Sequence, residues 1–144
     1  MIRASTPDDT VAIVDVWLAA SRESHDFVPY DVWLSHADAM REVYLPSSET
    51  YVATDSAGSV IGFVSLAGNE LAALFVEPSH QGCGIGRSLL LHAQAKREIL
   101  TLSVYVNNAR AVAFYRSHGF RPQEERIDQR TGQRETCMRW DAAA

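Results

Sequence analysis

Glycine recurs at every second position in residues 82–86, between an apolar run that ends at Val76 and an apolar-periodic run that begins at Ile85. Glycine lets the backbone approach a ligand closely, and the first N–H groups of a helix carry partial positive charge. A strand-to-helix loop of this composition is therefore suited to bind a phosphate group. A Gly-rich turn without any ligand is the alternative for this segment taken alone.

The loop does not match two widespread phosphate-binding sequences. A Walker loop requires Gly-x-x-x-x-Gly-Lys-Ser/Thr, but Gln81 stands at the first glycine and Arg87 at the lysine. A dinucleotide-binding loop requires GxGxxG, and Arg87 again takes the place of the last glycine. Neither a Walker-type nor a Rossmann-type nucleotide site is indicated.

A third pattern does match. Residues 81–86 spell Gln-x-x-Gly-x-Gly after the apolar run that ends at Val76, which resembles the signature of the GNAT superfamily of acetyl-CoA-dependent N-acetyltransferases. Residues 108–115 spell Asn-x-x-Ala-x-x-Phe-Tyr and are followed by Gly-Phe at 119–120, which resembles the second conserved helix of that superfamily and its entry to the next strand. The two motifs stand in the superfamily's order and separation, and the resemblance covers essentially the whole chain.

The resemblance implies acetyl-CoA as the cosubstrate. Its pantetheine arm would pair with free backbone groups of residues 74–76 as a short extra strand, and its pyrophosphate would lie on the N–H groups of residues 82–87. Asn108 would bond the cofactor arm, and it can also cap a helix because capping uses only its side-chain oxygen. The implied cofactor-binding residues are Leu74, Phe75, Val76, Gln81, Gly82, Cys83, Gly84, Ile85, Gly86, Arg87 and Asn108.

The same resemblance gives Tyr115 the role of the acid that protonates the leaving sulfur. From the residues alone, Tyr115 would be interpreted as an aromatic at the edge of the core beside Phe114. A backbone N–H near Val76 would donate to the acetyl carbonyl oxygen as negative charge develops there. We expect catalysis to depend on proton transfer rather than on a covalent enzyme intermediate.

Glu70 is the candidate general base, because it lies six residues before Val76, where the histone-acetylating branch of the superfamily has its catalytic glutamate. Strand alternation predicts that residues 70, 72, 74 and 76 share one face. Many superfamily members lack an acid at this position and use water. An exposed glutamate at the start of a strand therefore remains the alternative.

His25 and Phe27 lie in the break between the first two expected helices, which borders the acceptor cleft in the superfamily. They are the candidate acceptor-binding residues, and the alternative is that His25 is solvated, as a loop histidine usually is. The chain's two cysteines lack CxxC spacing, and no histidine pair has the spacing of metal ligands, so no metal site is expected; the other histidines are His36, His80, His92 and His118.

The elements that must position these residues follow from periodicity and breakers. Two helices, one after Thr6-Pro7 and one over residues 30–45, precede a three-stranded meander over residues 50–76. After the loop come a helix, a strand at 102–106, a helix at 108–118 and two final strands. The resemblance adds the arrangement: an α/β fold of the α+β mixed-sheet kind, GNAT-like, with a central, mostly antiparallel twisted sheet splayed between strands 4 and 5 and about four helices, in one domain spanning 1–144.

Composition narrows the partners. The formal net charge of −5 argues against nucleic acid or an anionic membrane as a partner, and no apolar run approaches about 18 residues, so we expect a cytoplasmic protein, monomeric or homodimeric. The expected reaction is direct attack, in a ternary complex, by a primary amine of a small molecule, a protein lysine or an N-terminus. An acyl-CoA-binding sensor without turnover is the alternative, against which the acid at Tyr115 argues. A ligand-free interaction domain would leave the glycines unexplained.

Overall fold

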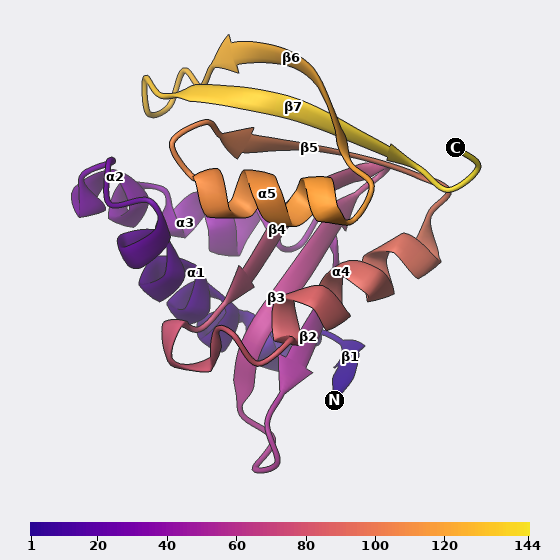
Figure 1. The fold of residues 1–144 in the computed structure, drawn as a ribbon. Helices are drawn as coiled ribbons and strands as arrows, with labels where there is room; N and C mark the ends of the chain where they lie inside the picture. Colours follow the sequence, from indigo (N-terminus) through magenta and orange to yellow (C-terminus); the bar gives the residue numbers. More distant parts are fainter.

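A seven-stranded sheet runs through the computed structural model, which describes residues 1–144 (Figure 1). The strands lie in the order β1-β2-β3-β4-β5-β7-β6, and every neighbouring pair is antiparallel except β4 and β5. The strands are β1 (Ile2–Ala4), β2 (Glu49–Thr54), β3 (Val60–Ala67), β4 (Glu70–Val76), β5 (Ile99–Tyr105), β6 (Arg121–Ile127) and β7 (Arg134–Asp141). This arrangement confirms the predicted mixed fold.

Helices cover both faces of the sheet (Figure 1). One face packs against α4 (Ile85–Lys96) and α5 (Ala109–Ser117), and the other packs against α1 (Thr10–Ser24), α2 (Tyr30–Ser35), α3 (Ala37–Ala39) and the π-helical η2 (Met40–Tyr44). Two short turns, η1 (Pro7–Asp9) and η3 (Pro78–His80), lead into α1 and into the Gly-rich loop. We call these two sides of the sheet the α4–α5 face and the α1 face, and each has its own apolar cluster.

The helix expected over residues 30–45 is interrupted. His36 has φ −98° and ψ −2°, which ends α2, and the chain then continues through α3 into η2. Trp33, Ala37 and Met40 nevertheless pack in the α1-face cluster, whereas Tyr44, which the helical spacing predicts on the same side, is 47% exposed. None of the helices combines the length and the apolar character that a membrane span requires.

The parallel strands β4 and β5 pair at one position only, Glu70 with Thr101. A backbone bond from the Thr101 N–H to the Asn69 oxygen, at 2.9 Å, lies next to that point. Beyond it they diverge toward Val76 and Tyr105. The predicted splay between the fourth and fifth strands is thus confirmed, and it leaves one edge of β4 without a partner strand.

A β-bulge at Ala72 changes which residues of β4 share a face. Ser65 pairs with Ala73 but Leu66 pairs with Leu71, so Ala72 has no partner on β3. Leu71, Leu74 and Val76 consequently pack on the α4–α5 face, while Ala73 and Phe75 pack on the α1 face. The prediction that residues 70, 72, 74 and 76 share a face was wrong, because the extra residue shifts the alternation by one.

Candidate active site

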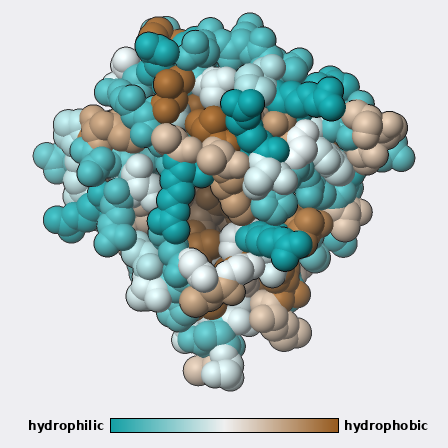
Figure 2. Space-filling view, viewed as in Figure 1, coloured by the Kyte–Doolittle hydropathy of each residue, from teal (hydrophilic) through white to brown (hydrophobic).

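A cavity of about 750 Å³ occupies the wedge between β4 and β5 and reaches both faces of the sheet. In the space-filling view the molecule is hollowed between α5 and the segment that leads into α4, with hydrophobic residues inside and hydrophilic ones at the rim (Figure 2). On the α4–α5 face the lining includes Gln81, Gly82, Gly84, Gly86, Arg87, Asn108, Phe114 and Tyr115. On the α1 face it includes Trp17, His25, Trp33, Tyr44, Glu70, Ser103, Tyr105, Arg126, Arg130 and Glu135.

The open edge of β4 presents backbone groups to this cavity. The Glu77 N–H donates to the Ile61 oxygen at 2.8 Å, so the alternation of an antiparallel ladder directs the backbone groups of Leu74 and Val76 away from β3. The Val76 oxygen accepts a bond from Gln81 Nε2 at 3.1 Å. The Val76 N–H and both Leu74 groups thus remain for an extended ligand to pair with.

Phe75 differs from its two neighbours. It lies opposite Phe63 in the part of the ladder where both residues exchange backbone bonds with the other strand, so its N–H and C=O point toward β3. Its side chain packs on the α1 face, with its ring centroid 6.1 Å from that of His25. A contact of Phe75 with a ligand in the wedge would therefore come from the ring.

The Gly-rich loop provides open space beside a helix N-terminus. Gly82 and Gly84 both have φ +83°, and a Cβ placed on either would meet no atom within 4 Å. Gly84 directly precedes the 12-residue α4, whose first N–H groups have no partner within the helix. Arg87 lines the cavity from the first turn of α4, whereas Cys83 and Ile85 do not line it and can contribute only through their backbone. These features fit a pyrophosphate group.

Tyr115 lies at the back of the wedge on α5. Its ring packs against Phe114 and Phe120, with centroids 5.3 and 5.6 Å away. No protein group hydrogen-bonds its hydroxyl, and the residue lines the cavity. Burial raises the pKa of the Tyr115 phenol above its usual value, so the hydroxyl keeps its hydrogen and can act as a donor.

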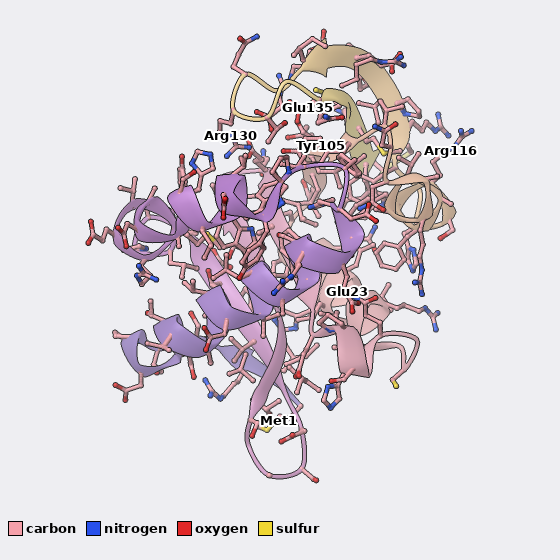
Figure 3. All side chains as sticks on the ribbon, turned by 90° about the vertical axis from the view of Figure 1, so that its left-hand side faces the viewer. Met1, Glu23, Tyr105, Arg116, Arg130 and Glu135 are labelled. Atoms are coloured by element: carbon pink, nitrogen blue, oxygen red, sulfur yellow. The ribbon has the colours of Figure 1, made fainter.

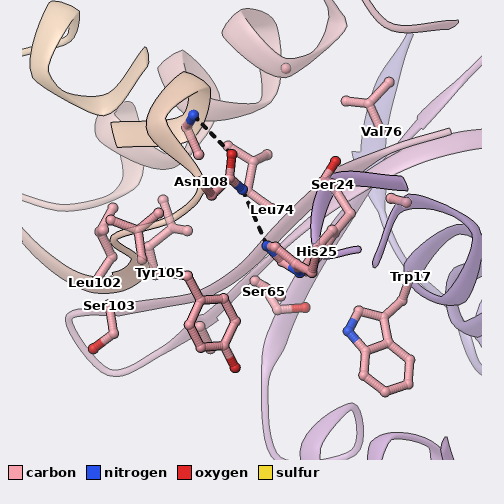
Figure 4. A pocket seen from close by; sticks show the side chains of 18 of the residues that line it. Trp17, Ser24, His25, Ser65, Leu74, Val76, Leu102, Ser103, Tyr105 and Asn108 are labelled. Carbon is pink, nitrogen blue, oxygen red and sulfur yellow. Dashed lines mark hydrogen bonds between the residues drawn. The ribbon is translucent and has the colours of Figure 1, made fainter. Parts of the chain in front are cut away.

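Asn108 caps α5 at the mouth of the wedge. Its Oδ1 accepts the Ala111 N–H at 3.2 Å, as the motif predicts for a helix cap, and its Nδ2 lies 3.2 Å from His25 Nε2 (Figure 4). Both contacts use the side chain, and Asn108 also lines the cavity. The residue therefore connects the α4–α5 face with the loop at the end of α1.

The bulge at Ala72 sets the position of Glu70. Glu70 pairs with Ala67 across the ladder and precedes Leu71, which faces α4–α5, so Glu70 lies on the α1 face. It is exposed and lines the cavity at the narrow end of the wedge. Glu70 and Tyr115 therefore approach the cavity from opposite faces of the sheet.

His25 and Phe27 occupy the turn after α1, but their roles in the packing differ. His25 is only 8% exposed and lines the cavity, whereas Phe27 does not line it and packs edge-on against His25 and Tyr105. Burial lowers the pKa of His25 to about 4, so its imidazole is neutral at neutral pH. The aromatic rings of Trp33 and Phe75 complete this cluster.

Several residues on the α1 face were not identified from the sequence. The Tyr105 hydroxyl donates to Asp128 at 2.5 Å, and Arg130 Nε donates to the same carboxylate at 3.3 Å. Arg126 Nε donates to Glu135 at 3.0 Å and forms a second ion pair on the same wall of the cavity. Tyr105, Arg130 and Glu135 lie together where the β6–β7 turn meets the end of β5 (Figure 3). The only indication of this surface in the sequence was the alternation of Thr101, Ser103 and Tyr105, which predicts that these residues share one face of a strand.

Comparison with known proteins identifies the family in which these features occur. Residues 46–122 match a family model described as an acetyltransferase (GNAT) domain. The chain is 33% identical over 120 residues to the peptidyl-lysine N-acetyltransferase YjaB of Escherichia coli strain K12, which covers 83% of this chain and 81% of YjaB. It is 34% identical over 121 residues to the peptidyl-lysine N-acetyltransferase YiaC of the same strain, which covers 83% of this chain and 82% of YiaC.

A solved structure agrees with these sequence comparisons. The solution structure of apo-form YjaB from Escherichia coli superposes with a TM-score of 0.85 at 29% identity, covering 97% of this chain and 96% of that chain. Gln81, Gly82, Gly84 and Gly86 of the first signature and Asn108, Ala111, Phe114 and Tyr115 of the second line the wedge. The chain therefore belongs to the GNAT family of acetyltransferases.

Proposed function

We propose that this protein binds acetyl-CoA in the wedge between β4 and β5 and transfers the acetyl group to lysine side chains of peptides or proteins. Acetyl transfer to amines is the activity of the family to which the chain belongs. The observation that carries the proposal is the continuity of one cavity, which joins the free backbone edge at Leu74 and Val76, the Gly-rich loop and the Tyr115 hydroxyl. Two relatives named as peptidyl-lysine N-acetyltransferases support the lysine acceptor.

The residues of the wedge suit the different parts of acetyl-CoA. The open edge at Leu74 and Val76 can pair with the amides of the pantetheine arm, and the loop from Gly82 to Arg87 can hold the pyrophosphate. Bound acetyl-CoA supplies an activated acetyl thioester, which an amine attacks directly in a ternary complex. The remaining side chains then have to position the amine and move protons.

Proton transfer is divided between the two faces of the sheet. Tyr115 retains its hydrogen at neutral pH and is the donor we assign to the leaving sulfur. Backbone N–H groups at the open edge of β4 are available to stabilise negative charge on a substrate carbonyl oxygen. Glu70 borders the cavity on the opposite face, where it could accept the proton of an incoming ammonium group directly or through water.

The acceptor would enter from the α1 face. Tyr44, Glu70, Ser103, Arg126 and Glu135 border the cavity on this side, so the opening presents both hydrogen-bond donors and acceptors. We assign His25 to the aromatic wall of this acceptor side, with Phe27 packed against it from outside the cavity. The formal net charge of −5 favours approach of a cationic lysine side chain over an anionic partner. We place the enzyme in the cytoplasm as a monomer or homodimer.

An acetylation assay tests this proposal. The purified protein is incubated with acetyl-CoA and a peptide containing one lysine and a blocked N-terminus, while free thiol is measured and mass spectrometry locates the acetyl group. The matched control is the same peptide with arginine in place of lysine. We expect thiol release that matches acetylation of the lysine peptide alone. Thiol release with small amines but not with lysine peptides would reject the peptidyl acceptor.

A further inference from the structure

The side-chain amide of Asn108 has a defined orientation. Its Oδ1 accepts the Ala111 N–H, which only the oxygen of an amide can do, so its Nδ2 must be the atom that faces His25 at 3.2 Å. Nδ2 carries two hydrogens. One of them points to His25, and the other has no hydrogen-bond partner in the protein, although Asn108 lines the wedge.

The orientation of Asn108 fixes the hydrogen of His25. Because Nδ2 can only donate, His25 Nε2 must be the acceptor and carry no hydrogen. The neutral imidazole therefore carries its hydrogen on Nδ1, which is fully buried and has no hydrogen-bond partner. A ring that pairs only through Nε2 while leaving Nδ1 unsatisfied indicates that the contact with Asn108 is the polar function of this histidine.

His25 also belongs to the acceptor side of the site. Its N–H donates to the Ser21 oxygen at the end of α1, and its oxygen accepts the Val28 N–H at 3.0 Å, so it forms the turn into α2. The bond to Asn108 joins residues 83 positions apart. It is the single side-chain hydrogen bond between the segment α1–α2 and α5 (Figure 4).

We propose that His25 is a positioning residue for Asn108: its Nε2 holds the Asn108 amide so that the second Nδ2 hydrogen is available to acyl-CoA in the wedge, and it thereby couples the α1–α2 turn to cofactor binding. The proposal rests on the proposed acetyl-CoA site. Without the acceptor at position 25, the Asn108 cap would persist through Oδ1, but the amide would lose its second anchor. The same contact implies that bound cofactor stabilises the turn after α1.

Three variants separate this role from simple packing. His25→Phe keeps an aromatic ring of similar size and removes the acceptor, whereas His25→Gln can place an amide oxygen near the position of Nε2. Asn108→Ser keeps a helix-capping oxygen and removes the Nδ2 donor. Calorimetric titration with acetyl-CoA should show binding about three- to tenfold weaker for His25→Phe, the range that one hydrogen bond supports, and nearly normal binding for His25→Gln. In the Asn108→Ser background, His25→Phe should cause no further weakening.

Two measurements on the parent protein keep the test independent of how the variants fold. Nitrogen-15 chemical shifts of the His25 ring, recorded without ligand, should show the hydrogen on Nδ1 and an unprotonated Nε2. Hydrogen exchange should show that acetyl-CoA protects the backbone amides of residues 25–28. A hydrogen on Nε2 would overturn the proposal, as would absence of protection in that turn.

The outcomes also distinguish this proposal from the proposed function. If the parent and His25→Phe bind acetyl-CoA with equal affinity, or if His25→Phe weakens binding equally in the Asn108→Ser background, His25 does not position Asn108 and the acetyl-CoA site stands. If the parent does not bind acetyl-CoA, the proposed function fails and this inference fails with it.

Discussion

Because His25 is buried, the protein should lose stability below neutral pH, and replacing His25 with glutamine should remove this loss. The residue is 8% exposed among aromatic rings, and burial lowers its pKa to about 4, whereas an unfolded chain holds histidine near about 6.5. Between these values the unfolded chain binds a proton that the folded protein excludes. Stability contributed by neutral His25 is therefore fully present above about pH 6.5 and is lost as the pH falls toward about 4. A protonated Nε2 would also face the Asn108 donor.

The difference between the two pKa values sets the size of the effect. A shift of about 2.5 units corresponds to about 3 kcal/mol, of which about 2.5 kcal/mol should be lost by pH 4.5. Urea unfolding of the parent and of His25→Gln at pH 7.5, 6.0, 5.0 and 4.5 would measure it, since carboxylate contributions such as that of Asp9 are common to both proteins. His80→Gln is the control, because His80 lies on η3 with a partly exposed ring. Equal pH dependence in the parent and His25→Gln would refute the reasoning.

Three further predictions concern other parts of the site. Gly84 and Gly58 have nearly the same backbone angle, φ +83° and +84°, and a Cβ at either would meet nothing within 4 Å, so Gly84→Ala and Gly58→Ala should each destabilise the fold by about 1–2 kcal/mol. Calorimetry should show weaker acetyl-CoA binding only for Gly84→Ala. Equal affinity in the two variants would exclude the loop as the phosphate site. Glu70→Gln should slow acetylation most at low pH, where the acceptor amine is protonated, and a pH-rate profile parallel to that of the parent would remove Glu70 as the base. Tyr105→Phe removes the hydrogen-bond donor to buried Asp128, so the free energy of unfolding in urea should fall by about 1–3 kcal/mol. The KM for the acceptor peptide should rise while the affinity for acetyl-CoA stays unchanged. A changed acetyl-CoA affinity would contradict the placement of Tyr105 on the acceptor side.

Local patterns were sufficient for the parts of the protein that depend on neighbours in sequence. The Gly-rich loop before α4 and the Asn108 cap of α5 could both be predicted, because a helix start is determined by a few consecutive residues. The splay between β4 and β5 followed from the resemblance to a family, not from periodicity. The loop and the helix cap on the α4–α5 face were thus predictable from the local sequence.

The acceptor side depends on contacts between distant residues, and there the sequence was a poor guide. The bulge at Ala72 arises from the register of β4 against β3, so strand alternation alone put Glu70 on the wrong face. His25 pairs with Asn108, 83 positions away, and Tyr105 is anchored by Asp128. No pattern within either segment records these pairings.

The central claim is that acetyl-CoA lies in the wedge with its thioester within reach of the Tyr115 hydroxyl. Its most direct test is to measure steady-state acetylation of a lysine peptide and acetyl-CoA affinity on the same preparations of the parent and Tyr115→Phe. Removing one hydroxyl while keeping the ring should preserve packing against Phe114 and Phe120. We expect kcat to fall by about 10²–10⁴-fold while acetyl-CoA affinity is nearly unchanged. A kcat within about threefold of the parent would contradict it and return Tyr115 to a packing role.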